Sequence, residues 1–269
     1  MKKVLYLLII LLLSGTIIGC EEKDNDSKKE NTKVEEKESK KELDVNDELV
    51  QNYYNIIRDY TGEFYSAYLS KQDTKASDLD YKGMFAIAAR MLTSDEVSEK
   101  GGAYYYIKRS DLEKRAKELF GNDIKFDYSQ GTDLNLFVQI EGSPLYAKTL
   151  FGSYDKKTDT YELYWGGIGG TCGIDDCYLR RSKLDNAYIL GDKLYITEKQ
   201  LYEFQDWHYE NGFVKASLYS DYDRKNEVGN YTKEGSSLDE YFVNAGSVTY
   251  VFEKNKDGNY NFIESIVKK

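Results

Sequence analysis

The stretch AYILGDKLYIT, Ala187–Thr197, indicates most clearly how this chain folds. Runs of aliphatic residues and tyrosine flank Gly191 and Asp192, and this pair of residue types favours the tight turn between two antiparallel strands. Parallel strands would need a long crossover connection, which this segment does not contain. We therefore predict a β-hairpin here.

Other segments of the C-terminal half show a similar alternation of apolar side chains. They are LNLFVQI (134–140), TLFGSYDKKTDTYELYW (149–165) and VTYVFEKNKDGNYNFIESIV (248–267). The second predicts a hairpin that turns near Lys157 and Thr158, and the third predicts one that turns at Asp257 and Gly258. Residues 122–269 are therefore expected to form mainly antiparallel β-sheet.

Nearer the N-terminus the apolar residues recur every three or four positions, which is the spacing of a helix. Leu49–Leu69 carries one apolar face, and Asp47 precedes it as a candidate N-cap. In Tyr81–Leu92 the segment MFAIAARML is apolar nearly all round, so a buried helix is expected there. Two helices are predicted in this part of the chain.

A third helix is expected in RSDLEKRAKELFG, after the strand-like run AYYYIK. Ser110 followed by Glu113 has the pattern of a capping box, and Gly121 stands where the helix should end. Helices over 49–121 followed by hairpins over 122–269 predict an α+β fold, because a doubly wound fold would alternate the two kinds of element.

Residues 1–19 have the layout of a secretory signal peptide. Lys2 and Lys3 are basic, and the uncharged run Val4–Gly19 that follows contains small residues before Cys20. An uncleaved membrane-spanning helix is the alternative interpretation. As a helix this run would reach about 24 Å, against about 30 Å for the hydrocarbon core of a bilayer, so a signal peptide is favoured.

The segment Ile17-Ile18-Gly19-Cys20 resembles the lipobox of bacterial lipoproteins, which is an aliphatic residue, a variable one, a small one and an invariant cysteine. The resemblance implies cleavage after Gly19 and attachment of lipid, with palmitate-type acyl chains, to the Cys20 thiol. Two acyl chains hold a protein on a bilayer where one does not. The resemblance thus implies a protein anchored to the cell membrane through acylated Cys20, on its extracytoplasmic face.

The segment behind the cysteine has the composition of a spacer. Residues 21–48 contain 12 acidic and 7 basic residues and no aromatic residue, proline or glycine. Such a segment buries too little apolar surface to offset the entropy of ordering. We therefore expect a lipidated, disordered acidic spacer over 20–48, roughly 30 Å across as a coil, and an extracytoplasmic domain over 49–269. A mixed-charge helix is the alternative for the spacer.

The balance of charge excludes some partners. The 269 residues include 37 basic and 47 acidic ones, a net charge of −10. Removal of Lys2 and Lys3 with the signal would make the chain still more acidic. An acidic chain has no electrostatic attraction to nucleic acid, so no nucleic-acid partner is expected.

Cys172 and Cys177 are the only cysteines besides Cys20. In an exported protein such a close pair favours a disulfide, which would close a small loop and contribute about 2 kcal/mol. Two free thiols are the alternative. A zinc site or a Cys–His nucleophile would have to use His208, the single histidine, together with ligands or an orienting group that the spacing does not supply.

YWGGIGGTCGIDDCYLRR, residues 164–181, is the most distinctive stretch of the chain. Its glycines favour an irregular loop, and the Lys-Ser/Thr ending of a phosphate-binding loop is missing. Asp175 and Asp176 stand between Trp165 and Tyr178, which makes this the candidate ligand-binding loop, with a sugar as the candidate contact. Adjacent aspartates also commonly occur in turns, so we assign them no catalytic role.

The sequence contains no coherent set of catalytic residues, metal ligands or cofactor motifs, so neither a cofactor nor a metal is expected. We expect a non-catalytic binding or interaction module at the cell envelope, with an unknown ligand. The alternative is a cell-wall-acting hydrolase that uses carboxylates near the 165–181 loop. A solute-binding protein is disfavoured, because such proteins alternate strands and helices in two lobes.

Overall fold

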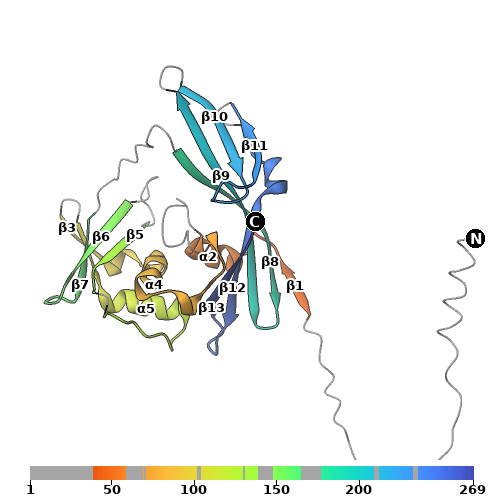
Figure 1. Ribbon diagram of the computed structural model, residues 1–269. Coiled ribbons are helices and arrows are strands. Elements are labelled where there is room, and N and C mark those ends of the chain that lie inside the picture. The colour runs from red at the N-terminus through yellow and green to blue at the C-terminus, as the bar shows by residue number, and fades with distance from the viewer. Residues whose placement is uncertain are drawn as a thin grey trace, which may run out of the picture. The chain divides into compact units, whose positions relative to one another are not determined.

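The computed structural model describes residues 39–58, 69, 71–101, 104–129, 131–138, 148–164, 177–208, 212–232 and 236–269. All of them belong to one compact unit, Glu38–Lys269. Its described part combines helices with two antiparallel sheets, so the chain is an α+β protein in which sheet predominates (Figure 1).

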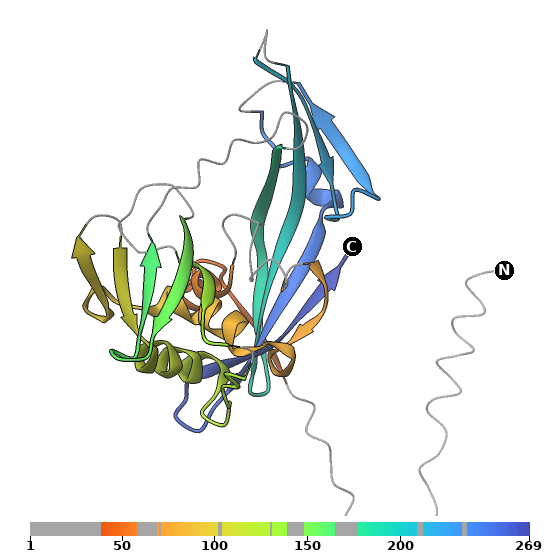
Figure 2. The same cartoon turned by 60° about the vertical axis from the view of Figure 1, so that its left-hand side comes forward.

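Sheet A, the larger sheet, is built around the long strand β9 (Lys193–His208). β8 (Cys177–Leu190) pairs with one edge of β9, and the turn at Gly191 and Asp192 joins the two. Gly191 has a φ of 58°, the left-handed conformation that this kind of turn requires. The predicted hairpin is confirmed, and Figure 2 shows its two strands side by side.

The opposite edge of β9 is shared by two strands. β12 (Gly246–Lys254) pairs with the first half of β9, from Lys193 to Gln200. β10 (Gly212–Tyr219) pairs with the second half, from Tyr202 to His208. The sheet therefore divides at Gln200–Tyr202, and this division is termed the fork.

β13 (Tyr260–Lys268) lies beside β12 and completes the hairpin predicted to turn at Asp257 and Gly258. Gly258 in its turn has a φ of 88°, so that prediction is also confirmed. Three shorter strands line the edges of the sheet, namely β1 (Lys40–Leu43) on β8, β2 (Thr74–Lys75) on β13 and β11 (Glu227–Tyr231) on β10.

β1 lies inside the segment that was expected to be a disordered spacer. Its residues, KKEL, are mostly exposed and bury little apolar surface. They are ordered because the edge of β8 offers backbone partners, with Lys40 opposite Leu190 and Leu43 opposite Ala187. The folded body therefore begins earlier than the predicted boundary at Leu49.

Sheet B contains five strands in the order β3-β4-β7-β6-β5, all antiparallel. Their bounds are β3 (Val97–Gly101), β4 (Tyr104–Lys108), β5 (Leu134–Val138), β6 (Lys148–Asp155) and β7 (Thr160–Tyr164). The β6–β7 turn covers Lys157 and Thr158, as predicted. The sequence did not predict that the strands divide into two sheets, or that β3 would lie in the helical half.

The first helix, α2 (Glu48–Ile57), begins where the sequence indicated. The Asp47 side chain accepts a hydrogen bond from the Leu49 N–H at 2.9 Å, so the predicted N-cap is confirmed. The helix ends at Arg58, whose ψ of 141° is extended. The helical segment predicted over Leu49–Leu69 is therefore interrupted at Arg58, and residues 59–68 lie outside the described part.

α4 (Tyr81–Ala88) is buried along most of its length, as the apolar MFAIAARML indicated. Short 3₁₀ turns follow or precede other elements, namely η1 (Ala76–Asp78), η2 (Ala89–Met91), η3 (Ser94–Glu96) and η4 (Tyr241–Asn244). The buried face of α4 packs on α5 and on β5 of sheet B.

α5 (Arg109–Phe120) has Lys108 as its N-cap and begins two residues earlier than a capping box at Ser110 would require, so that prediction is wrong. The Arg109 guanidinium forms an ion pair with the carboxylate of Asp159, in the β6–β7 turn, at 2.9 Å. The backbone N–H of Arg109 also donates to the Asp159 carbonyl at 3.1 Å. Glu113 accepts a hydrogen bond from the Tyr128 hydroxyl instead. Gly121, with a φ of 102°, ends the helix as predicted.

One hydrophobic core joins the helices to both sheets. α5 contacts β4 of sheet B and β13 of sheet A, and Figure 1 shows α4 and α5 between the two. The rings of Phe120 and Phe262 meet edge to face at 6.0 Å, and those of Phe85 and Tyr161 at 6.3 Å. Aromatic packing from both sides therefore holds the helical layer in place.

Glu96 connects η3 to α5 through a largely buried ion pair. Its Oε2 atom accepts hydrogen bonds from the Arg115 guanidinium and from the Thr93 backbone N–H, both at 2.9 Å. Burial raises the pKa of the Glu96 carboxyl, but the Thr93 N–H and Arg115 outweigh it and hold that pKa below its ordinary value. The ionised carboxylate thus stabilises the fold.

Replacing Glu96 by Gln should lower the free energy of unfolding by about 1–2 kcal/mol at pH 7. A depressed pKa stabilises the fold above the unfolded-state value, about 4.3, and this contribution is lost as the pH falls through the folded-state value. Urea unfolding at pH 7 and at pH 3 should therefore show the difference shrinking in acid. The exposed neighbour Asp95, changed to Asn, is the control, and a difference of equal size at both pH values would contradict the assignment.

Candidate functional site

A buried carboxylate lies beside the fork. Glu198 on β9 is fully buried and accepts hydrogen bonds from four side chains. The hydroxyls of Tyr54 and Tyr250 donate to it at 2.5 and 2.7 Å, and the amide of Gln200 donates at 2.6 Å. The guanidinium of Arg180, on β8, completes the set as a buried ion pair. Two strands and a helix thus converge with β9 on one charge.

The two tyrosines of this array remain donors at neutral pH. Burial, and next the negative charge of Glu198, raise the pKa of the Tyr54 phenol far above its ordinary value of 10.0. The same two causes raise the pKa of Tyr250. Each hydroxyl therefore keeps its proton and directs it at the carboxylate, whose charge Arg180 balances.

The array extends from Glu198 along β9 to the fork. The Tyr202 hydroxyl donates to the side-chain oxygen of Gln200 at 3.0 Å, and the Gln200 amide donates to Glu198. Tyr202 and Gln200 are 3% and 2% exposed. The Tyr202 proton is therefore directed inward, toward the array around Glu198.

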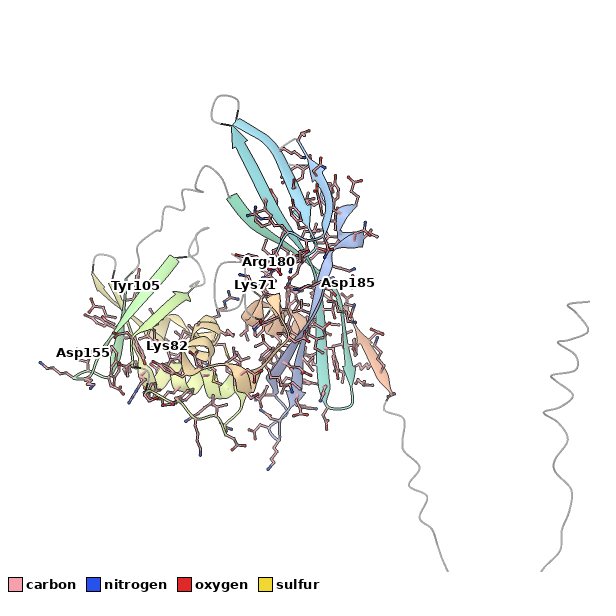
Figure 3. The ribbon with its side chains drawn as sticks, viewed as in Figure 1. Lys71, Lys82, Tyr105, Asp155, Arg180 and Asp185 are labelled. Carbon is pink, nitrogen blue, oxygen red and sulfur yellow. The ribbon has the colours of Figure 1, made fainter. Side chains whose placement is uncertain are left out.

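A pocket of about 350 Å³ opens at this point and is termed the fork pocket. Its lining includes Gln200 and Tyr202 from β9, Gly246 from the start of β12, and Lys71, which Figure 3 labels. A Cβ atom added to Gly246 would lie 2.3 Å from the carbonyl oxygen of Ser220. Glycine at this position thus lets the segment after β10 approach the sheet closely.

Asp221 shapes the wall of the fork pocket. Its carboxylate is buried and accepts the backbone N–H groups of Lys225 at 3.1 Å and Asn226 at 2.9 Å. These bonds hold the turn between β10 and β11. Asp221 is therefore occupied in holding the backbone and is poorly placed to act as a catalytic base.

The mouth of the pocket carries an ammonium group over an aromatic ring. The Nζ atom of Lys71 lies 3.6 Å from the centroid of the Tyr222 ring, which in turn meets the Tyr202 ring edge to face at 5.9 Å. Among the described residues no carboxylate forms an ion pair with Lys71. Lys269 stands near Asp223, with 3.9 Å between nitrogen and oxygen. The pocket thus combines cationic, aromatic and acceptor groups.

A second buried carboxylate of β9, Glu203, faces the other side of the sheet. It pairs with the Arg181 guanidinium at 2.6 Å and accepts a hydrogen bond from the Tyr231 hydroxyl of β11. Like Glu198, Glu203 links neighbouring strands to β9, in this case β8 and β11.

Most residues of the predicted ligand loop lie outside the described part of the chain. Trp165, Cys172, Asp175 and Asp176 are among them, and so is Cys20. The disulfide between Cys172 and Cys177 and the lipid attachment at Cys20 therefore stay predictions.

The remaining sequence candidates lie on strands of sheet A. Cys177 and Tyr178 open β8, opposite Gln205 and Phe204 of β9. His208 is the last residue of β9. The structure thus places the end of the predicted loop and the single histidine on adjacent strands of one sheet.

Within the described part of the chain, no three or more His, Cys, Asp or Glu side chains are grouped so that they would hold a metal ion. No helix there has the length and apolar character needed to cross a membrane. Comparison with protein-family models, curated proteins and solved structures finds no match to this chain. Any function must therefore be argued from the chemistry of the site itself.

The fork pocket was not anticipated from the sequence, although a signal for it is present. Ile196, Glu198, Gln200 and Tyr202 alternate along one face of β9, and all are buried. Polar residues at core-facing positions of a strand are unusual and normally need specific partners. This alternation is the signal that could have indicated a buried polar array.

Replacing Tyr54 by Phe should lower the free energy of unfolding by about 1.5–3 kcal/mol, because a hydrogen bond to a charged, buried group is lost. Replacing Glu198 by Gln should cost more, about 3–5 kcal/mol, since the Arg180 charge loses its partner. Urea unfolding at pH 7 measures both changes. Tyr195→Phe is the matched control, because this tyrosine lies on the same strand but its ring stacks on Tyr188, outside the array. Equal stability of all three variants would rule out the array as a determinant of stability.

Proposed function

We propose that this chain is a lipid-anchored protein of the outer face of a cell membrane, whose body binds a ligand in the fork pocket without transforming it. The signal-like N-terminus and the lipobox resemblance at Cys20 support the anchor. The fork pocket and its polar lining support ligand binding.

The direction from which the chain enters the fold agrees with this arrangement. Lys40 of β1 pairs with Leu190 of β8, directly before the turn at Gly191 and Asp192. The N-terminal segment therefore joins sheet A at its hairpin end.

The fork pocket lies away from that end of the sheet. Gln200 is seven residues along β9 from Lys193, at the hairpin, which corresponds to about 23 Å of strand. A tether that leaves from the hairpin end would thus leave the pocket accessible to ligands outside the cell.

The non-catalytic part of the proposal is supported by the hydrogen bonds and ion pairs that the buried carboxylates at the fork already form. Glu198, Glu203 and Asp221 each accept hydrogen bonds that hold parts of the fold together. General acid–base catalysis needs a carboxyl group within reach of the substrate and available to exchange a proton. These three are occupied by structural partners instead.

Changing Cys20 to Ser should abolish lipid attachment. The wild-type protein expressed in a bacterial host should fractionate with membranes, begin at residue 20 and incorporate a palmitate analogue, and the variant should do none of these. Mass spectrometry of the N-terminus and labelling with the analogue measure the outcome. Cys172→Ser is the control and should still be lipidated. A wild-type protein that begins at Met1 without fatty acid would contradict the anchor.

The purified full chain should bind a soluble digest of cell-wall glycan and leave it intact. Binding to the folded state should raise the thermal midpoint, because a ligand that prefers the native protein stabilises it. Mass spectrometry of the digest before and after incubation tests for cleavage. New products that disappear in Asp175→Asn, Asp176→Asn or His208→Ala would instead establish the alternative, a cell-wall hydrolase.

A further inference from the structure

We propose that the fork pocket binds a single sugar ring that carries a carboxylate group. The inference rests on the proposed function, since it names the ligand class of the same pocket. Three features of the pocket support it: a cation without a described carboxylate partner, an acceptor oxygen with an inward-directed proton, and the limited volume.

Lys71 supplies the site for the carboxylate. Its side chain is half-buried, and its ammonium group is held 3.6 Å above the Tyr222 ring. The ring displaces part of the hydration of this cation but does not neutralise it. A carboxylate in the pocket would complete the pair with charge-assisted hydrogen bonds. Lys269 also lines the pocket, with its ammonium group 3.9 Å from Asp223.

Tyr202 supplies a site for a ligand hydroxyl. Tyr202 lines the pocket and donates its own proton to Gln200, so a ligand hydroxyl that reached its phenol oxygen would have to act as the donor. Asp223 also lines the pocket and is an acceptor. A ligand that satisfies these groups must bring hydroxyl donors as well as an anion. A sugar acid carries both, whereas inorganic phosphate is mainly an acceptor.

The size and lining of the pocket limit the ligand further. Its volume of about 350 Å³ is near the lower end of the range for small-molecule pockets, about 300–1,000 Å³. Val267 is the one aliphatic side chain among its lining residues. A small polar ring therefore fits better than an extended apolar molecule.

Titration calorimetry with the full chain tests the proposal through two matched sugars. N-acetylmuramic acid and N-acetylglucosamine share the ring and the acetamido group, and only the first carries a carboxylate. We expect the acidic sugar to bind at least about tenfold more tightly, because one charge-assisted contact contributes about that factor. The preference should weaken at high salt.

Two variants separate the roles of the pocket residues. Lys71→Gln should remove the preference, so that both sugars bind equally weakly. Tyr202→Phe should weaken both sugars to a similar extent, because it removes an acceptor for a ring hydroxyl. Lys256→Gln is the matched control, since this lysine lies in the β12–β13 turn at the other end of the ladder.

Several results would overturn the inference. They are equal affinity for the two sugars, a preference that survives in Lys71→Gln, and binding of inorganic phosphate as tight as that of the acidic sugar, which would indicate a simple anion site. Failure of both sugars to bind would reject the ligand class. The proposed function would then still be decided by the wall-digest and Cys20 experiments, which do not depend on Lys71.

Discussion

The burial of the Glu198 charge is the constraint on which much of this structure depends. A carboxylate removed from water is tolerated only when donors replace its hydration. Here the donors come from α2, β8, β9 and β12, so the charge is satisfied only when these four elements occupy their native positions together. Hydrophobic packing would bring α2 against sheet A without specifying its position. The hydroxyl of Tyr54, which reaches Oε2 of Glu198, defines that position.

The pocket also depends on β9, because this strand is longer than its neighbour β12. β9 has 16 residues and β12 has nine, so the edge that β12 leaves at Gly246 is taken over by β10. β10 and β12 pair with successive halves of the same edge of β9. The chain that leaves β10 must therefore turn away from β9 at the fork, where β12 begins. Asp221 stabilises that turn, and the glycine at 246 admits its backbone. The hollow therefore follows from the topology, and its polar lining continues the array that begins at Glu198.

The balance of charged side chains in the fork pocket differs from that of the whole chain. The protein carries a net charge of −10, which favours solubility and disfavours contact with polyanions. At the fork, three lysines and two aspartates line the pocket, and one of the aspartates is buried in backbone hydrogen bonds. Lysines therefore outnumber aspartates by one in the lining of this pocket, although the chain as a whole is acidic. Such a contrast favours a compact anion over an extended one, because the attractive region is small.

Features that depend only on neighbours along the chain could be predicted from the residue types. The turns at Gly191 and Gly258, the Asp47 cap and the helix end at Gly121 each need only a few consecutive residues, so their residue types were sufficient. The signal peptide, the lipid site at Cys20 and the loop around Asp175 are predictions of the same local kind, on residues outside the described part. Long-range contacts instead divide the strands into two sheets, order β1 against β8 and start α5 before Ser110. They also assemble the fork pocket. Tyr54 and Glu198 are 144 residues apart, and no local pattern specifies which distant donor will satisfy a buried charge.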